Sequence, residues 1–194
     1  PTPTPTVYVP EPEPTATPVP TPSAPPPGSA KYPGVGYGMR VDLSNDLPRS
    51  LRMLTGAGFS WAGVQIRWEE LESSKGNINW GRIDPIVSAA QAAGVKLMFS
   101  VVTSPSWARP AGCSYVGPPS NPKDYADFVS AIATRHKGKV HAFEIWNEEN
   151  VYYEWCNFGK MNAGQYVELL RQAYSAIKAA DPDAVVISGA LTPT

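Results

Sequence analysis

The chain has 194 residues, and its 16 basic and 17 acidic side chains give a formal net charge of −1. This balance, without a basic stripe, argues against nucleic-acid binding, which requires a surface that neutralises phosphates. No apolar run approaches the roughly 18 residues that a membrane-spanning helix needs, so a membrane span is not expected.

Residues 1–30 have the composition of an extended linker. They contain 12 of the 22 prolines, six threonines and only two charged residues. Such a segment cannot bury enough apolar surface to offset the entropy of ordering, which predicts a disordered Pro/Thr-rich linker. Linkers of this kind join modules, so we expect another module upstream in an extracellular protein. The disordered tail of an intracellular protein is the alternative.

Residues 31–194 are expected to form the globular part, because short apolar segments alternate there with helical patterns. This alternation is typical of strand and helix units around a parallel sheet. Four complete units and the strand of a fifth can be distinguished. The expected strands are residues 35–41, 61–67, 95–102, 140–146 and 184–188.

Between these strands, apolar side chains recur at helical spacing, so each set forms one stripe that faces a sheet. The stripes are Leu47, Leu51 and Leu54; Ile83, Ile86, Val87 and Ala90; Tyr125, Phe128, Val129 and Ile132; and Tyr166, Leu169, Leu170 and Ala173. The loops that leave the third and fourth strands, residues 103–120 and 147–161, are longer than the connections that enter strands. Because loops after the strands build the active site of a barrel, the carboxyl edge of the sheet is the expected functional face.

Polar residues alternate with apolar ones in two of the expected strands. Gln65 and Arg67 share one face of the second strand, and Glu144 and Trp146 share one face of the fourth. A sheet covered by helices on both faces would be apolar throughout, so the pattern favours a barrel with a polar interior. For Glu144 and Arg67, a buried structural ion pair is the alternative.

The most informative stretch is residues 143–150, Phe-Glu-Ile-Trp-Asn-Glu-Glu-Asn, which begins as an apolar strand and ends in an amide and carboxylates. Its Trp-Asn-Glu sequence resembles the end of the fourth strand in clan A glycoside hydrolases. The order of the surrounding elements is similar too: Arg67 ends the second strand, residues 68–72 lead to Gly76 and Trp80, and a Ser-Pro-Ser-Trp loop follows the third strand. The likeness is greatest to family 39 xylosidases and to the cellulase-like branch of family 5.

This resemblance implies an α/β fold: a partial TIM (β/α)8 barrel, with the first four β/α units plus strand 5, preceded by the linker. The family's nucleophile is a glutamate at the end of strand 7, which has no counterpart before Thr194. Residues 31–194 are therefore expected to be the N-terminal portion of a catalytic barrel, without turnover of its own.

The resemblance also implies roles for particular residues. A retaining glycosidase needs one carboxylic acid as proton donor and a second carboxylate about 5 Å away as nucleophile. The family's acid/base corresponds to Glu148, and the amide that binds the sugar 2-hydroxyl corresponds to Asn147. Arg67 corresponds to the arginine that orients the nucleophile and lowers its pKa. Trp107 would offer a flat apolar face to a pyranose ring.

Three aromatic residues of the loop after the fourth strand, Tyr152, Tyr153 and Trp155, are candidates to line a sugar cleft. Packing within the loop is the alternative. The two cysteines, Cys113 and Cys156, fall in the loops after the third and fourth strands, which are neighbours in a barrel. A disulfide would pin these loops together and favour an oxidising compartment, and two free thiols are the alternative.

Other polar and aromatic residues are expected to take no part in catalysis. Trp146 is expected to pack inside the barrel, and Glu149 and Glu154 are expected to be solvated loop charges. No cofactor or metal is expected, because His136 and His141 have no cysteine or carboxylate cluster near them in the sequence.

The sequence therefore predicts a secreted or cell-surface retaining glycoside hydrolase that acts on a β-linked oligo- or polysaccharide, with the acid/base half in this chain. A noncatalytic carbohydrate-binding module on a truncated barrel is the alternative. A half barrel that is completed by self-association is a third hypothesis.

Overall fold

The computed structural model describes residues 36–41, 46–113, 117–156 and 163–193. The expected linker, residues 1–30, lies outside them. Five parallel strands form one sheet in the order β1-β2-β3-β4-β5. The strands are β1 (Gly38–Arg40), β2 (Trp61–Arg67), β3 (Lys96–Val102), β4 (Ala142–Ile145) and β5 (Val185–Ser188).

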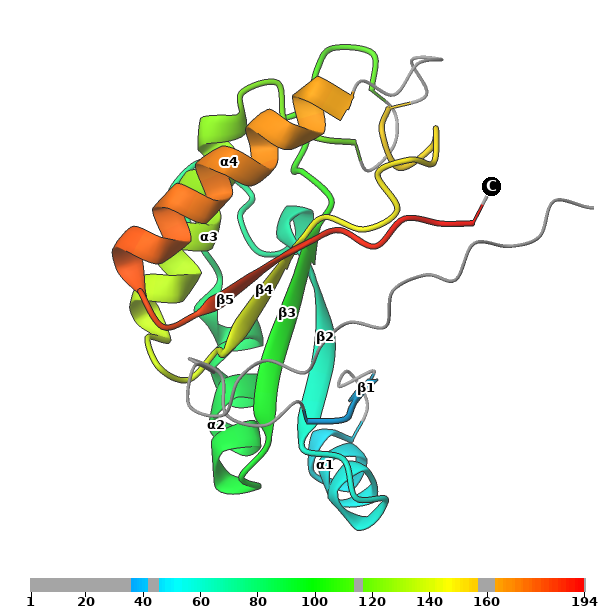
Figure 1. Cartoon of the computed structure of the whole chain (residues 1–194). Coiled ribbons are helices and arrows are strands. Elements are labelled where there is room, and N and C mark those ends of the chain that lie inside the picture. The colour runs from blue at the N-terminus through cyan, green and yellow to red at the C-terminus, as the bar shows by residue number, and fades with distance from the viewer. Residues whose placement is uncertain (1–35, 42–45, 114–116, 157–162, 194) are drawn as a thin grey trace, which may run out of the picture. The chain divides into compact units, whose positions relative to one another are not determined.

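Helices connect consecutive strands, and Figure 1 shows α2, α3 and α4 on the same side of the sheet. The helices are α1 (Leu47–Gly56), α2 (Asp84–Ala92), α3 (Pro122–Arg135) and α4 (Ala163–Ala180), with the 3-10 turns η1 (Trp68–Glu70) and η2 (Trp80–Arg82) after β2. A sheet whose strands follow chain order, with its helices on one side, is the arrangement of a β/α barrel. The expected partial barrel, with four units plus strand 5, is confirmed.

The helical stripes expected from the sequence are the faces that pack on the sheet. Leu51 and Leu54 of α1, Val87 and Ala90 of α2, the whole α3 set, and Tyr166, Leu169 and Ala173 of α4 are buried in one hydrophobic core. Two of the helix starts are fixed by side-chain caps: Asp46 accepts a hydrogen bond from the Arg49 amide, and Asn121 accepts one from the Lys123 amide.

The two faces of the sheet differ as the alternation predicts. Gln65, Ser100, Glu144 and Ile187 form one register row across β2, β3, β4 and β5. Gln65 and Ile187 are exposed, because this row faces away from the helices. The adjacent row on the other face includes Phe99 and Phe143, which are fully buried. The polar face of the sheet is therefore the inner face of the barrel.

Trp146 does not share a face with Glu144, which corrects one part of the alternation. Its φ of 70° ends the extended backbone one residue after β4. The indole is fully buried, and its ring lies 6.1 Å from the ring of Tyr125 and 5.7 Å from that of Trp155. Trp146 therefore packs with the core side chains beside α3 rather than on the polar face.

Candidate active site

The carboxyl edge of the sheet holds an unusual set of backbone conformations. Among the described residues, four non-glycine residues have positive φ: Thr103 at 61°, Trp146 at 70°, Glu148 at 50° and Cys156 at 68°. All four lie in the loops that follow β3 and β4. Each such conformation costs on the order of 1–3 kcal/mol, and residues held this way cluster at functional sites. These backbone conformations therefore lie at the carboxyl edge of the sheet, which the lengths of the loops also indicate as the functional face.

Glu148 lies at this edge with its backbone tied to the segment after β5. Its amide donates a 2.9 Å hydrogen bond to the Ala190 carbonyl oxygen. Two residues later, the Asn150 side chain donates to the Thr192 carbonyl at 2.7 Å and accepts from the Thr192 amide at 2.9 Å. Glu148 and Asn147 are both half-buried. Hydrogen bonds to the segment after β5 therefore hold the loop that carries the predicted acid/base, Glu148, and the side-chain amide of Asn147.

Arg67, at the end of β2, is held between two carboxylates. Its Nη2 atom lies 2.5 Å from Glu69 Oε1, and its Nε atom lies 3.1 Å from Glu70 Oε1. The side chain is 41% exposed, so Arg67 does not form the buried ion pair with Glu144 that was the alternative for these two residues. Arg67 instead reaches the carboxyl edge with its charge balanced by neighbours.

The charges of Glu148 and Arg67 both act on Glu154. Burial raises the pKa of the Glu154 carboxyl, the negative charge of Glu148 raises it further, and the positive charge of Arg67 opposes both. Glu154 therefore lies within electrostatic range of two candidate site residues, one from β2 and one from its own loop. Glu154 is half-buried rather than fully solvated, which corrects the expectation for this residue.

Glu149 is also not a solvated loop charge. Its side chain is buried, with only 3% of the residue exposed, and packs against Gly189, where a Cβ atom would overlap Glu149 Oε2. Burial raises the pKa of its carboxyl, and the charge of Glu144 adds to that effect, while a hydrogen bond to its own backbone opposes it. The sequence does not reveal this burial, because the run of four polar residues at 147–150 after the strand is typical of an exposed loop.

The aromatic candidates fall into two groups. Tyr152 and Tyr153 are exposed, at 64% and 42%, and their rings lie edge to face at 5.3 Å. Trp155 is only 6% exposed and packs between Trp146 and Tyr166, with its indole N–H donating to Gln165 Oε1 at 3.3 Å. Loop packing, the alternative that the sequence left open, is therefore the better description of Trp155.

Trp107 packs the loop after β3 against η1. Its indole N–H donates a 2.9 Å hydrogen bond to the Glu72 carbonyl oxygen, and its ring meets the Trp68 ring edge-on at 5.6 Å. The Glu72 carboxylate in turn accepts hydrogen bonds from the Trp68 indole and from the Gly76 amide, each at 2.5 Å. Trp107 is half-buried in this cluster, and its role as a sugar platform stays a prediction.

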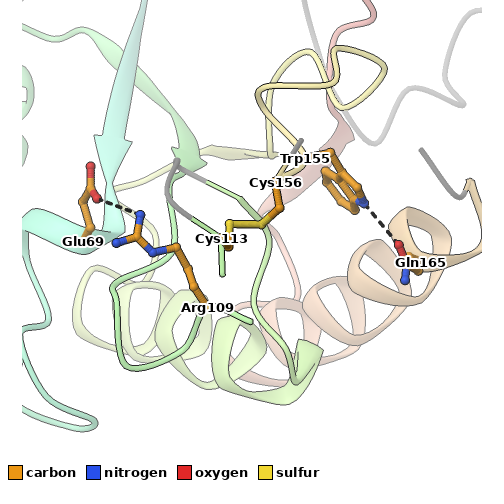
Figure 2. The surroundings of a disulfide bond; sticks show 6 residues. All are labelled: Glu69, Arg109, Cys113, Trp155, Cys156 and Gln165. Atoms are coloured by element: carbon orange, nitrogen blue, oxygen red, sulfur yellow. Dashed lines mark hydrogen bonds and ion pairs between the residues drawn. A yellow bond between two sulfur atoms is a disulfide. The ribbon is translucent and has the colours of Figure 1, made fainter. Parts of the chain in front are cut away.

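A disulfide joins the loops after β3 and β4 (Figure 2). It links Cys113 to Cys156 across 43 residues of sequence, with a Cα–Cα distance of 5.0 Å. Gly117 packs directly against it, and a Cβ atom at this position would overlap the Cys156 sulfur. The loop of the predicted acid/base is thereby fixed to its neighbour on the β3 side as well as to β5.

The two histidines have structural contacts. His136 is buried, which lowers its pKa, and its Nε2 atom lies 3.3 Å from Asp84 Oδ1. His141 accepts a hydrogen bond from the Leu97 amide through Nδ1 at 3.3 Å. In the part of the chain that the structure describes, no group of three or more His, Cys, Asp or Glu side chains is placed to hold a metal ion. No helix within those residues is long and apolar enough to cross a membrane.

Together, the sheet order, the one-sided helical layer and the loops at the carboxyl edge define the first part of a β/α barrel. Solved clan A glycoside hydrolases share this fold. The chain is similar to a family 39 glycoside hydrolase from Bacteroides cellulosilyticus WH2, with a TM-score of 0.64 and 24% identity over 78% of this chain and 30% of that one. An exo-β-1,4-mannosidase from Opitutaceae bacterium strain TAV5 gives a TM-score of 0.63 and 19% identity over 78% and 31%.

The sequence is also similar to a curated protein whose name is that of a glycosidase. The chain is 27% identical over 123 residues to endo-1,4-beta-xylanase 3 of Hypocrea jecorina, a match that covers 61% of this chain and 34% of the relative. The chain thus spans about a third of the length of the curated relatives that it matches. No protein-family model matches it. The resemblance to clan A glycoside hydrolases that the sequence indicates is confirmed.

Proposed function

We propose that this chain is the acid/base half of a retaining glycoside hydrolase barrel that acts on a β-linked oligo- or polysaccharide, with Glu148 as the acid/base. The observation that carries the proposal is the placement of Glu148 at the end of β4. It has a positive φ and lies beside Asn147, and its charge and that of Arg67 both act on Glu154. The barrel fold that this chain shares with solved glycoside hydrolases supports the same proposal.

In this proposal Glu148 acts twice. It first donates its proton to the glycosidic oxygen while the bond from that oxygen to the anomeric carbon breaks and a nucleophilic carboxylate bonds to the carbon. As a carboxylate it then takes a proton from water, whose oxygen displaces the nucleophile. We expect the nucleophile on a later strand than the five described, with Arg67 facing it. Asn147 would bind the sugar 2-hydroxyl.

The substrate to test first is a β-1,4-linked xylan, because the curated relatives carry the name of an endo-1,4-beta-xylanase. The natural gene product should hydrolyse xylo-oligosaccharides. Glu148→Gln should lower the rate on an unactivated xylo-oligosaccharide by about 10²- to 10⁴-fold, the usual contribution of a general acid. The loss should be much smaller on an aryl xyloside whose leaving group needs no proton.

Glu168→Gln is the matched control, because it makes the same chemical change at an exposed side chain of α4 and should keep most of the activity. An unchanged rate for Glu148→Gln on the unactivated substrate would refute the acid/base role. Binding of xylo-oligosaccharides without turnover, with an affinity that Glu148→Ala leaves intact, would instead identify a noncatalytic carbohydrate-binding module. Calorimetry separates these two results.

We also propose that the protein is secreted or displayed on the cell surface, with a further module upstream of residues 1–30. The disulfide between Cys113 and Cys156 supports an oxidising compartment, because such bonds are rare in reducing cytosol. The natural producer should release the protein into its medium or hold it on its outer surface, with Cys113 and Cys156 unreactive toward a thiol reagent. Recovery of the protein only from the cytosol, with both cysteines alkylated by a thiol reagent, would contradict this localisation.

A further inference from the structure

Five charged side chains at the carboxyl edge form a continuous chain of ion pairs. In order of contact they are Arg109, Glu69, Arg67, Glu70 and Arg82. Their closest N–O distances are 3.8 Å for Arg109–Glu69, 2.5 Å for Glu69–Arg67, 3.1 Å for Arg67–Glu70 and 2.9 Å for Glu70–Arg82. Arg67, the arginine expected to face the nucleophile, is the middle member, so its orientation depends on both carboxylates.

The two carboxylates differ in how firmly they are held. Glu69 contacts Arg67 through Oε1 and Arg109 through Oε2, and its amide donates a 2.9 Å hydrogen bond to the Thr103 carbonyl oxygen after β3. Its side chain is 24% exposed and that of Arg109 only 17%. The Glu70–Arg82 pair is more exposed, at 40% and 57%. Because water screens exposed ion pairs, Glu69 orients Arg67 more strongly than Glu70 does.

The Glu69 side is also connected to the disulfide. Arg109 belongs to the loop after β3, which Cys113 ties to Cys156 in the loop that carries Glu148. Figure 2 shows Arg109 between Glu69 and this disulfide, with its guanidinium directed at the Glu69 carboxylate. Hydrogen bonds from Cys113 N to Pro110 O and from Ser120 N to Ala108 O shape the same loop around Arg109. Release of the disulfide would therefore loosen the arginine that holds Glu69.

We propose that Glu69 is a positioning residue that, together with the disulfide-anchored Arg109, sets the orientation of Arg67 toward the substrate cleft. The rate of hydrolysis then depends on the disulfide between Cys113 and Cys156, because the Glu69 carboxylate contacts both Arg109 and Arg67. This inference rests on the glycosidase function proposed above. Glu69 itself does not touch the reacting atoms, so its effect acts on the rate through the geometry of Arg67.

The test compares Glu69→Gln with Glu70→Gln in the natural gene product, with xylo-oligosaccharides as substrate. Both variants remove one carboxylate that contacts Arg67. Glu69→Gln should lower kcat by about 10- to 100-fold with little change in KM, since small misplacements of a site residue cost that much. Glu70→Gln should cost at most about fivefold, as expected for an exposed pair. Thermal melting of both variants checks that each is folded.

Reduction of the disulfide supplies a readout that a merely structural role would not give. Wild-type kcat should fall toward the Glu69→Gln level on reduction, whereas reduced Glu69→Gln should lose little more, because the two changes break the same bridge. Equal losses for Glu69→Gln and Glu70→Gln, or fully additive losses on reduction, would overturn the inference while a Glu148-dependent wild-type activity still stood. A wild-type protein without Glu148-dependent hydrolysis would overturn both proposals.

Discussion

At the scale of single residues, Glu149 shows how a loop side chain becomes part of the core. The sequence predicts the motif and the identity of Glu148, but it does not predict which of the consecutive residues Glu148, Glu149 and Asn150 is buried. That depends on the positive φ of Trp146 and Glu148, which turns the chain so that Glu149 packs against Gly189. Backbone strain of this kind has no signature in polarity or periodicity, so the sequence could not reveal it.

The buried carboxyl makes stability depend on pH. Burial raises the pKa of Glu149 in the folded protein, Glu144 of β4 adds to this effect, and the neighbouring α4 hydroxyl, Tyr166, stays neutral. The contribution of Glu149 is then fully present below its unfolded pKa and is lost as the pH rises through its folded pKa. From about pH 4 to pH 7, the melting temperature of wild type should fall relative to that of Glu149→Gln, as circular dichroism would measure.

Glu168 provides a control of opposite sign. Hydrogen bonds from Arg171 and Gln172 lower its pKa to about 2, so its contribution is present above the unfolded pKa and is lost as the pH falls. The difference in melting temperature between wild type and Glu168→Gln should therefore change with pH only in the acid range and stay constant above it. A difference in melting temperature between Glu149→Gln and wild type that stays constant with pH would show that the pKa of Glu149 is not raised in the folded protein.

At the scale of elements, two tyrosines join the starts of helices to the ends of strands. Tyr125 near the start of α3 donates a 2.7 Å hydrogen bond to the Val101 carbonyl of β3, and Tyr166 near the start of α4 donates a 3.0 Å bond to the Ile145 carbonyl of β4. The Tyr166 oxygen also accepts from the Gly189 amide at 2.5 Å. Burial raises the pKa of Tyr166 to about 12, which keeps the donor protonated. This single hydroxyl therefore fixes the ends of β4 and β5 together.

Tyr166→Phe should destabilise the fold. The change leaves the Ile145 carbonyl and the Gly189 amide without their buried partner, which costs about 1–3 kcal/mol. Urea denaturation measures this loss. Tyr174→Phe is the control, because Tyr174 lies on the same helix but is 51% exposed, and its removal should leave stability nearly unchanged. Equal midpoints for Tyr166→Phe and wild type would show that the hydroxyl does not hold the two strands.

Most of the elements could be predicted because their signal is local. Apolar periodicity gives the four helices, and the expected strand at residues 61–67 coincides with β2. The expected strand at residues 140–146 is longer than β4 (Ala142–Ile145), since the backbone leaves the extended region at Trp146. Periodicity could not predict the position of Trp155, for which lining a sugar cleft and packing within the loop were both open. Its tertiary contacts with Trp146 and Tyr166 place it in the core.

At the scale of the whole molecule, the sheet and its loops depend on each other for order. Neighbouring parallel strands come from parts of the chain that are far apart in sequence. The loops at the carboxyl edge are therefore held by bonds between neighbouring β/α units rather than by contacts within each loop. Three such links meet near Glu148: the hydrogen bond from its amide to the Ala190 carbonyl oxygen, the Asn150–Thr192 hydrogen bonds and the disulfide. Only the disulfide is covalent, and it alone persists when the protein unfolds.

The covalent link should therefore stabilise the whole described fold by limiting the unfolded chain. A bond across a sequence separation of 43 residues is worth about 4 kcal/mol in the chain-entropy model. Replacing both Cys113 and Cys156 with serine should lower the free energy of unfolding toward that extent, measured by urea denaturation without reductant. Reduced wild type should match the double variant, and reductant should leave the double variant unchanged. A double variant as stable as oxidised wild type would show that the bond does not close this loop in solution.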